Sequence, residues 1–230
     1  PNVQDAKNQT VRLLQEYARS GHLTDIAPPL PIDAPTAATE LARTLRGAKR
    51  GSYVAVLAYV APTPARDRAL RQLAGTLRGR TGAATTIGYG PRFLHSTGQL
   101  HKGGPNTGVF LQLSADDPAD LPVPNAAYSF SVLKQAQALG DHAALTARGR
   151  SVVRIHLGQD VDAGLRQLQT ILTEPARRSS RPLRRKPKPA ATTKAKPTAR
   201  KRPAPPTRRA ARRRRRWRGR CPPPRRQRSA

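Results

Sequence analysis

The spacing of apolar residues along positions 1–175 alternates between the period of a helix and that of a strand. Helical spacing, with glycine or proline near the ends, predicts helices over 5–20, 35–45, 64–77, 130–147 and 161–172. Short apolar runs predict strands over 52–60, 83–87, 107–113 and 151–157. This order of elements is typical of a layered α/β domain.

The run Ser52–Val60 is the strongest strand signal. It is continuously apolar, rich in valine and tyrosine, and bounded by glycine and proline. Strands that are buried on both faces of a parallel sheet have this pattern. The proline-rich residues 24–34 predict a linker or loop. Because helices precede the first predicted strand, we expect the start of the sheet to lie upstream of Pro1.

Charge divides the chain into two parts. Residues 1–175 hold all 13 acidic residues and 19 of the 43 basic ones, whereas residues 176–230 hold 24 basic residues and no acidic one. The second part is also rich in proline and almost free of branched apolar residues. So little apolar surface does not offset the entropy of ordering, and like charges repel, so we expect a disordered tail.

Composition narrows the function further. No apolar run reaches the roughly 18–20 residues of a membrane span, so we expect no membrane association. Cys221 is the single cysteine, which excludes an internal disulfide framework and a cysteine metal site. No histidine pair has the spacing of zinc ligands. A secretion leader is not visible, so we expect a cytoplasmic protein, and the start at Pro1 suggests a fragment without its N-terminal part.

The densest polar cluster of the body spans residues 88–105, where glycines stand among histidine, basic and hydroxyl side chains. Glycine costs a helix about 1 kcal/mol, so the segment predicts a loop that bends sharply or lies close to a ligand. It follows the predicted strand 83–87. Loops at the carboxyl ends of strands bind ligands in α/β sheets, so this loop is a candidate site.

The side chains of this loop suit a sugar phosphate. Arg92 and Lys102 can offset the charge of a phosphate, and backbone N–H groups of a glycine-rich turn can hold its oxygens. His95 or His101 can move a proton near neutral pH. The alternative interpretation is a tight loop stacked on the sheet, with solvated histidines and lysine.

The remaining polar residues predict less specific roles. We expect the isolated histidines to be surface or packing residues: His22, His142 and His156. The aspartates of the loop 114–125 are expected to be solvated. The sequence has no G-x-S-x-G, P-loop or dinucleotide-binding motif.

From Tyr89 to Val109 the sequence YGPRFLHSTGQLHKGGPNTGV resembles the glucose-6-phosphate isomerase region of bacterial bifunctional transaldolase/glucose-6-phosphate isomerases. The resemblance continues through Ala126–Asp141 and Arg148–Gly158, and Tyr53–Tyr59 also fits it. It covers most of residues 1–173 and none of the tail. Several long segments agree in order and spacing, so the resemblance is specific.

The resemblance implies a sugar-isomerase (SIS-type) three-layer α/β sandwich with a mainly parallel sheet. Residues 1–50 would be a helical or linker segment, 51–175 the SIS-type domain, and 176–230 the disordered basic tail. The implied reaction interconverts glucose 6-phosphate and fructose 6-phosphate, in glycolysis, gluconeogenesis and the pentose phosphate pathway, without metal or organic cofactor. In this family a histidine opens the sugar ring, and a glutamate moves a proton between C1 and C2 through an enediol.

The ring-opening histidine of the family lies in a segment similar to Leu-His-Ser-x-Gly-Gln, which falls on Leu94–Gln99. The resemblance therefore implies that His95 opens the ring, with His101 as the competing residue. A lysine of the family's last helix has Arg166 as its nearest counterpart. The residues expected to bind the sugar or its phosphate are Arg92, Ser96, Gln99, His101, Lys102 and Arg166.

Two departures from the family matter. The proton-transferring glutamate of the family lies ahead of the histidine, but between Tyr53 and His95 the only carboxylate here is Asp67, so the base stays unassigned. Arg166 keeps the charge of the family's lysine but not its ability to donate a proton. The transaldolase part and the first SIS half would lie upstream as partners of this domain. We therefore expect the fragment alone to be inactive or weakly active.

The tail admits two interpretations. Its positive charges would bind DNA or RNA without sequence preference, and Trp217 could stack on a base, so a nucleic-acid-binding protein is the alternative function. Alternatively, a reading-frame shift in a GC-rich gene produced the tail. Arginine, proline and alanine have GC-rich codons, and both the acidic residues and the resemblance end near Glu174.

Overall fold

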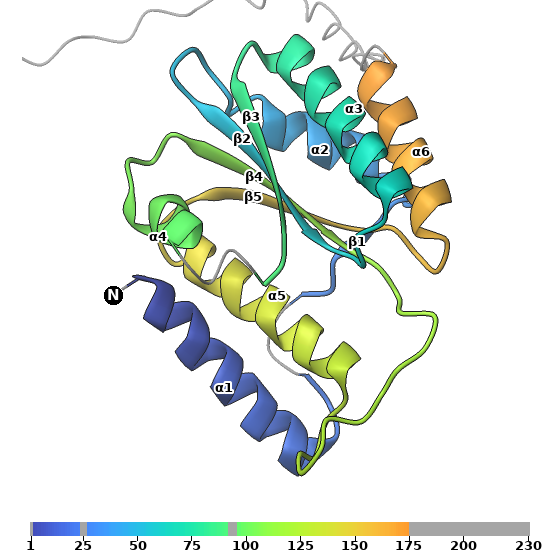
Figure 1. Ribbon diagram of the computed structural model, residues 1–230. Coiled ribbons are helices and arrows are strands. Elements are labelled where there is room, and N and C mark those ends of the chain that lie inside the picture. The colour runs from blue at the N-terminus through green and yellow to red at the C-terminus, as the bar shows by residue number, and fades with distance from the viewer. Residues whose placement is uncertain (1, 24–26, 92–95, 175–230) are drawn as a thin grey trace, which may run out of the picture. The chain divides into compact units, whose positions relative to one another are not determined.

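The computed structural model describes residues 2–23, 27–91 and 96–174 (Figure 1). The predicted tail, 176–230, lies outside the described residues. The helices and strands follow in this order: α1 (Asn2–Ser20), β1 (Leu30–Pro31), α2 (Ala37–Leu45), β2 (Tyr53–Tyr59), α3 (Pro64–Thr81), β3 (Ala84–Tyr89), α4 (Ser96–Gly103), β4 (Gly108–Ser114), α5 (Phe130–Thr146), β5 (Ser151–His156) and α6 (Val161–Thr173).

The strands form one five-stranded sheet in the order β1-β5-β4-β2-β3. Each neighbouring pair is parallel. β2 lies between β3 and β4, where Leu57 is in register with Gly88 on one side and Gln112 on the other. The prediction of an α/β fold with a mainly parallel sheet is confirmed.

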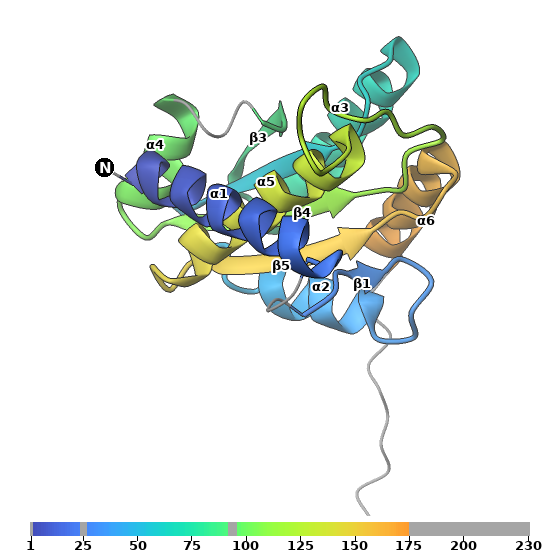
Figure 2. The same ribbon diagram turned by 90° about the horizontal axis from the view of Figure 1, so that it is seen from below.

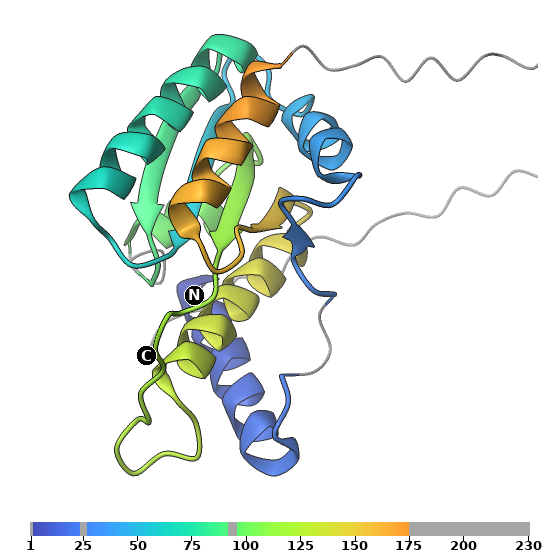
Figure 3. The same ribbon diagram turned by 90° about the vertical axis from the view of Figure 1, so that its right-hand side faces the viewer.

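Helices cover both faces of the sheet (Figure 3). α2, α3 and α6 contribute to one buried cluster with alternate residues of β2, whereas α5 packs on the other face. α1 lies alongside α5 (Figure 2). The chain leaves β2 through α3 on one face and leaves β4 through α5 on the other. The carboxyl ends of β2 and β4 therefore form a topological switch point, where α/β sheets bind ligands.

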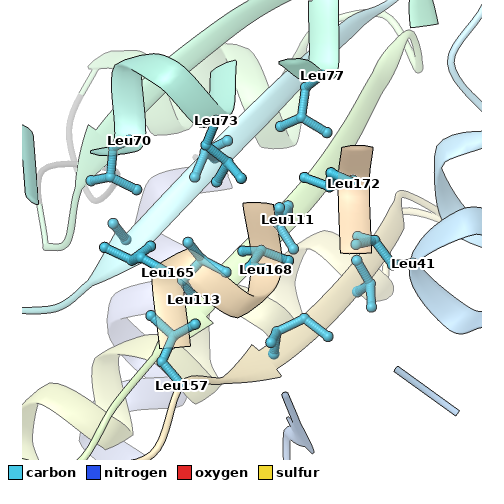
Figure 4. Packing of buried hydrophobic residues seen from close by; sticks show 14 of the residues in the cluster. Leu41, Leu70, Leu73, Leu77, Leu111, Leu113, Leu157, Leu165, Leu168 and Leu172 are labelled. Atoms are coloured by element: carbon cyan, nitrogen blue, oxygen red, sulfur yellow. The ribbon is translucent and has the colours of Figure 1, made fainter. Parts of the chain in front are cut away.

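The larger buried cluster lies between the sheet and α2, α3 and α6. Val54, Val56 and Ala58 of β2 contribute to it from the sheet. Leucines of α3 and α6 pack together over β4 (Figure 4), and they are Leu70, Leu73, Leu77, Leu165, Leu168 and Leu172. Full burial of a leucine contributes about 1.5–3 kcal/mol, so this cluster is the main apolar contribution to the stability of that face.

Side-chain caps fix where three of the helices begin. The side chains of Thr63, Ser129 and Asp160 each accept a hydrogen bond from a backbone N–H in the first turn of the following helix. Such caps replace bonds that the helix itself does not make. α3 ends at Gly82, whose left-handed φ of +68° favours glycine. These signals are local, which is why the sequence predicts these helices well.

Two elements differ from the sequence-based expectations. β1 lies inside the segment predicted as a linker, and it pairs Leu30 with Ile155 at the edge of the sheet. A strand of the sheet thus precedes β2 within this chain. The second difference is α4, which forms where a glycine-rich loop was predicted. Among the described residues, no helix is long and apolar enough to cross a membrane.

Candidate functional site

The structure describes some of the predicted catalytic and binding residues, and it does not bring all of these together. Arg92 and His95 lie outside the described residues, so their roles in phosphate binding and ring opening stay predictions. Ser96 and Gln99 lie at the start of α4, which packs against α1 and α5. Arg166 is exposed on α6, which packs against α3 on the opposite face of the sheet. The described part of the chain therefore does not bring Arg166 together with α4.

His101 lies in the interior rather than on an open loop. Its side chain is 3% exposed, and its Nδ1 lies 2.9 Å from the hydroxyl of Tyr53. The ring stacks on Tyr53 and meets the edge of Phe110. Burial, and then the charges of Lys102 and Arg150, lower the pKa of His101 to about 4. A neutral ring packed near the start of β2 does not suit acid–base work at an open site.

Lys102 likewise points inward, where it forms an ion pair with Asp141 of α5. The two side chains are 0% and 1% exposed. Burial raises the pKa of Asp141, and the Lys102 ammonium opposes that rise. Burial, with the nearby Asp141 carboxylate, also raises the pKa of Tyr59. Arg150 donates to the carbonyl oxygens of Lys102 and Gly104, at 3.0 and 2.6 Å. These contacts hold α4 against α5 and the sheet.

A cavity of about 400 Å³ opens at the switch point. Ligand pockets in proteins measure about 300–1,000 Å³. Its walls come from the carboxyl ends of β2, β4 and β5, from α5, and from the segment before β1. Most of the lining is apolar. The polar side chains that line it include Ser114, Lys134, Arg154 and His156.

Ser114 and His156 end two neighbouring strands and lie opposite each other in register. The Ser114 hydroxyl is 3.2 Å from His156 Nδ1, and His156 Nε2 is 3.3 Å from a carboxylate oxygen of Asp116. These contacts run from a serine through a histidine to an aspartate, which is the order of contacts in a serine–histidine–aspartate triad. However, the N–H groups of Leu157 and Asp116 donate to the carbonyls of Ser114 and Gly158, so they are not available as oxyanion donors. We therefore interpret the contacts of Ser114 and Asp116 as orienting the His156 ring, and we do not interpret Ser114 as a nucleophile.

The basic side chains around the cavity differ in whether they have a carboxylate partner. The Lys134 ammonium lies 2.6 Å from Asp117, so this loop aspartate, which we expected to be solvated, has a cationic partner. Asp116 lies 3.3 Å from His156 Nε2. Arg154 donates through Nη1 to the carbonyl of Ala27 at 2.6 Å. Burial lowers the pKa of Arg154. Arg154 is thus a charged group with a desolvation cost on the cavity wall.

The wall of the cavity also contacts Gly90, near the end of the described range 27–91. Tyr59 lines the cavity, and its ring packs on Gly90. A Cβ added at Gly90 would lie 2.3 Å from a carbon of that ring, so only glycine allows this approach. Gly90 also donates a hydrogen bond to the carbonyl of Ala58. The segment 92–95 therefore begins two residues after a contact with the cavity wall.

Sequence reasoning missed Ser114, Arg154 and His156 as a group, because it treated each residue alone. The final residues of neighbouring parallel strands meet at one edge of the sheet. The polar residues at the ends of the predicted strands 107–113 and 151–157 were therefore the signal available in the sequence. Within the described ranges, no three His, Cys, Asp or Glu side chains gather as metal ligands.

The described residues define a doubly wound parallel α/β domain with a cavity at its switch point. No family model matches the chain, and neither does any curated protein. Among solved structures, the chain is similar to the crystal structure of a hypothetical protein, TT0462, from Thermus thermophilus, with 17% sequence identity and a TM-score of 0.49. The match covers 70% of this chain and 43% of that one, so this chain spans less than half of that protein's length.

Proposed function

We propose that residues 1–175 are the C-terminal glucose-6-phosphate isomerase part of a bifunctional transaldolase/glucose-6-phosphate isomerase, with the SIS-type three-layer fold. The observation that carries the proposal is the cavity at the switch point, beside the start of the segment that resembles the family's ring-opening sequence. A formed pocket with a few polar groups at this place is the default ligand site of an α/β sheet. The resemblance of Tyr89–Val109 supports the choice of substrate.

The chemistry of the cavity suits a small hydroxylated anion. Lys134, Arg154 and His156 provide basic groups, and Ser114 and Gln135 provide hydrogen-bonding side chains. A hexose phosphate carries both a dianionic group and a chain of hydroxyls. The apolar part of the lining lowers the local dielectric constant, which strengthens electrostatic contacts with the ligand.

In the proposed reaction, His95 opens the sugar ring. Its imidazole takes the proton from the C1 hydroxyl and gives a proton to the ring oxygen, which suits a group that titrates near neutral pH. A base then moves a proton between C2 and C1 of the open chain through the enediol. Asp67 already accepts a hydrogen bond from the Tyr89 hydroxyl at 2.6 Å, and we do not assign it as that base. The proposal leaves the base to the upstream SIS half.

The test is conversion of fructose 6-phosphate to glucose 6-phosphate, coupled to a glucose-6-phosphate dehydrogenase. The purified chain and the intact bifunctional protein would be compared, each as wild type, His95→Ala and the exposed control His22→Ala. We expect His95→Ala to lower turnover by about 10²–10⁴-fold and His22→Ala to leave it unchanged. Undiminished turnover in His95→Ala would remove that residue from the mechanism. Absence of both turnover and fructose 6-phosphate binding in the intact protein would overturn the proposal.

The charge of residues 176–230 favours a second candidate function, binding of nucleic acid. With 24 basic and no acidic residues, this segment would release many counterions from DNA or RNA. Retention of the chain on a DNA column should fall steeply with salt and disappear on deletion of 176–230. A second frame of the gene that encodes an ordinary C-terminus near codon 175 would instead favour the frameshift interpretation.

A further inference from the structure

Among the basic side chains that line the cavity in the described ranges, Arg154 has no carboxylate partner. Lys134 forms an ion pair with Asp117, and the His156 ring lies beside the Asp116 carboxylate. Among the residues that the structure describes, none offers Arg154 a carboxylate within ion-pair distance, and its Nε is buried without a hydrogen-bond partner.

This arrangement of Arg154 costs free energy in two ways. An arginine stays protonated even when burial lowers its pKa, so the site keeps a positive charge that is partly removed from water. A buried donor without a partner adds a further cost. An anion in the cavity would offset the first cost, because it would pair with the guanidinium that lines the cavity wall.

The shape and surroundings of Arg154 favour an oxyanion. The planar guanidinium presents parallel N–H groups that match two oxygens of a phosphate. The Ser114 hydroxyl lies on the same cavity wall as a second polar contact. Apolar side chains such as Leu139 line the rest and lower the local dielectric constant, which strengthens the pairing. Of the aspartates nearby, Asp117 has the Lys134 ammonium as its partner, which limits its repulsion of the ligand.

We propose that this cavity binds the phosphate group of a small organic phosphate, and that Arg154 holds that phosphate with the Ser114 hydroxyl beside it. The inference rests on the proposed function for the sugar part of the ligand, but not for the phosphate. It assigns to this domain a phosphate site separate from Ser96, Gln99 and Lys102, which were the phosphate or sugar contacts expected from the sequence.

The first measurement is a titration of the full chain with inorganic phosphate, and then with fructose 6-phosphate, at 150 mM salt. Binding is followed by calorimetry and by the NMR signal of the His156 ring, which lines the cavity. The variants are Arg154→Met, Arg154→Lys, and Arg12→Met as an exposed control on α1. The control accounts for the loss of one positive charge elsewhere on the domain.

We expect Arg154→Met to weaken the binding of both ligands at least about tenfold, as for loss of a charge-assisted hydrogen bond, and Arg154→Lys to weaken it less. Arg12→Met should bind as wild type does. The proposal is overturned if phosphate does not shift the His156 signal of the wild type, a result that needs no variant to fold. It is also overturned if a folded Arg154→Met binds phosphate as the wild type does.

The two proposals fail in different ways. Arg154-dependent phosphate binding by an intact protein without isomerase turnover supports the phosphate site and overturns the isomerase function. Isomerase turnover and fructose 6-phosphate binding that are unchanged in Arg154→Met support the isomerase function and overturn the phosphate site.

Discussion

Replacing Lys102 with methionine leaves the Asp141 carboxylate buried without its ammonium partner. The two side chains are 0% and 1% exposed, so solvent does not screen the remaining charge. Removal of one partner of a buried ion pair costs about 3–5 kcal/mol. Domains are stable by about 5–15 kcal/mol, so Lys102→Met should lose a large part of the free energy of unfolding.

The loss should depend on pH in a defined direction. Burial raises the pKa of Asp141, and without the ammonium that pKa rises further. Above about pH 4, the native variant then keeps a proton that an unfolded aspartate has released. Its stability therefore falls as pH rises from there towards the native pKa. The difference between wild type and Lys102→Met should be larger at pH 7 than at pH 4.5.

The assay is urea-induced unfolding followed by far-UV circular dichroism at both pH values. Lys49→Met is the matched control at an exposed lysine, and we expect it to stay within about 0.5 kcal/mol of the wild type. The double variant Lys102→Met/Asp141→Leu should recover most of the loss, since apolar replacement of a whole buried pair is often neutral. A loss below about 1 kcal/mol at pH 7, or a difference that grows on acidification, would refute the reasoning.

Two further predictions concern α5. A Cβ added at Gly140 would lie 2.6 Å from Thr10 Oγ1, so Gly140→Ala should push α1 away and lower the free energy of unfolding by about 1–3 kcal/mol. The control is Gly75→Ala, where an added Cβ would meet nothing within 4 Å. In the same urea assay, the control should stabilise α3 by about 0.5–1 kcal/mol. Equal effects would contradict the tight packing at Gly140. Burial, and then the charge of Arg154, lower the pKa of His142 to about 4. Arg154→Met should therefore raise the pKa of His142, as measured by NMR titration. An unchanged pKa would leave burial as the sole cause.

The sequence predicted the elements whose signals are local. The continuous apolar run of β2 and the leucine stripe of α3 both form as expected. β1 was missed because two residues, Leu30 and Pro31, leave no periodicity, and only the pairing with β5 makes them a strand. α4 was missed because its glycines disfavour a helix locally, while burial of its last turn stabilises it.

The candidate site was harder to predict because it depends on contacts between residues that are far apart in the sequence. The glycine-rich cluster was singled out by composition, but Lys102 turns inward because its partner, Asp141, comes from a different helix. The contact of His156 with Ser114 depends on the order of β4 and β5 in the sheet. Sequence patterns report which residues are polar, whereas strand order decides which of them meet.

The native places of α1 and β1 have a consequence for how the chain is made. Leu13 and Leu14 of α1 pack against Ala136 and Leu139 of α5, and β1 pairs with β5. At about 5–20 residues per second, a ribosome needs on the order of ten seconds to synthesise the segment between them. Throughout that interval the leucines of α1 lack their native partners on α5, so α1 can dock in its native place only after α5 has been synthesised.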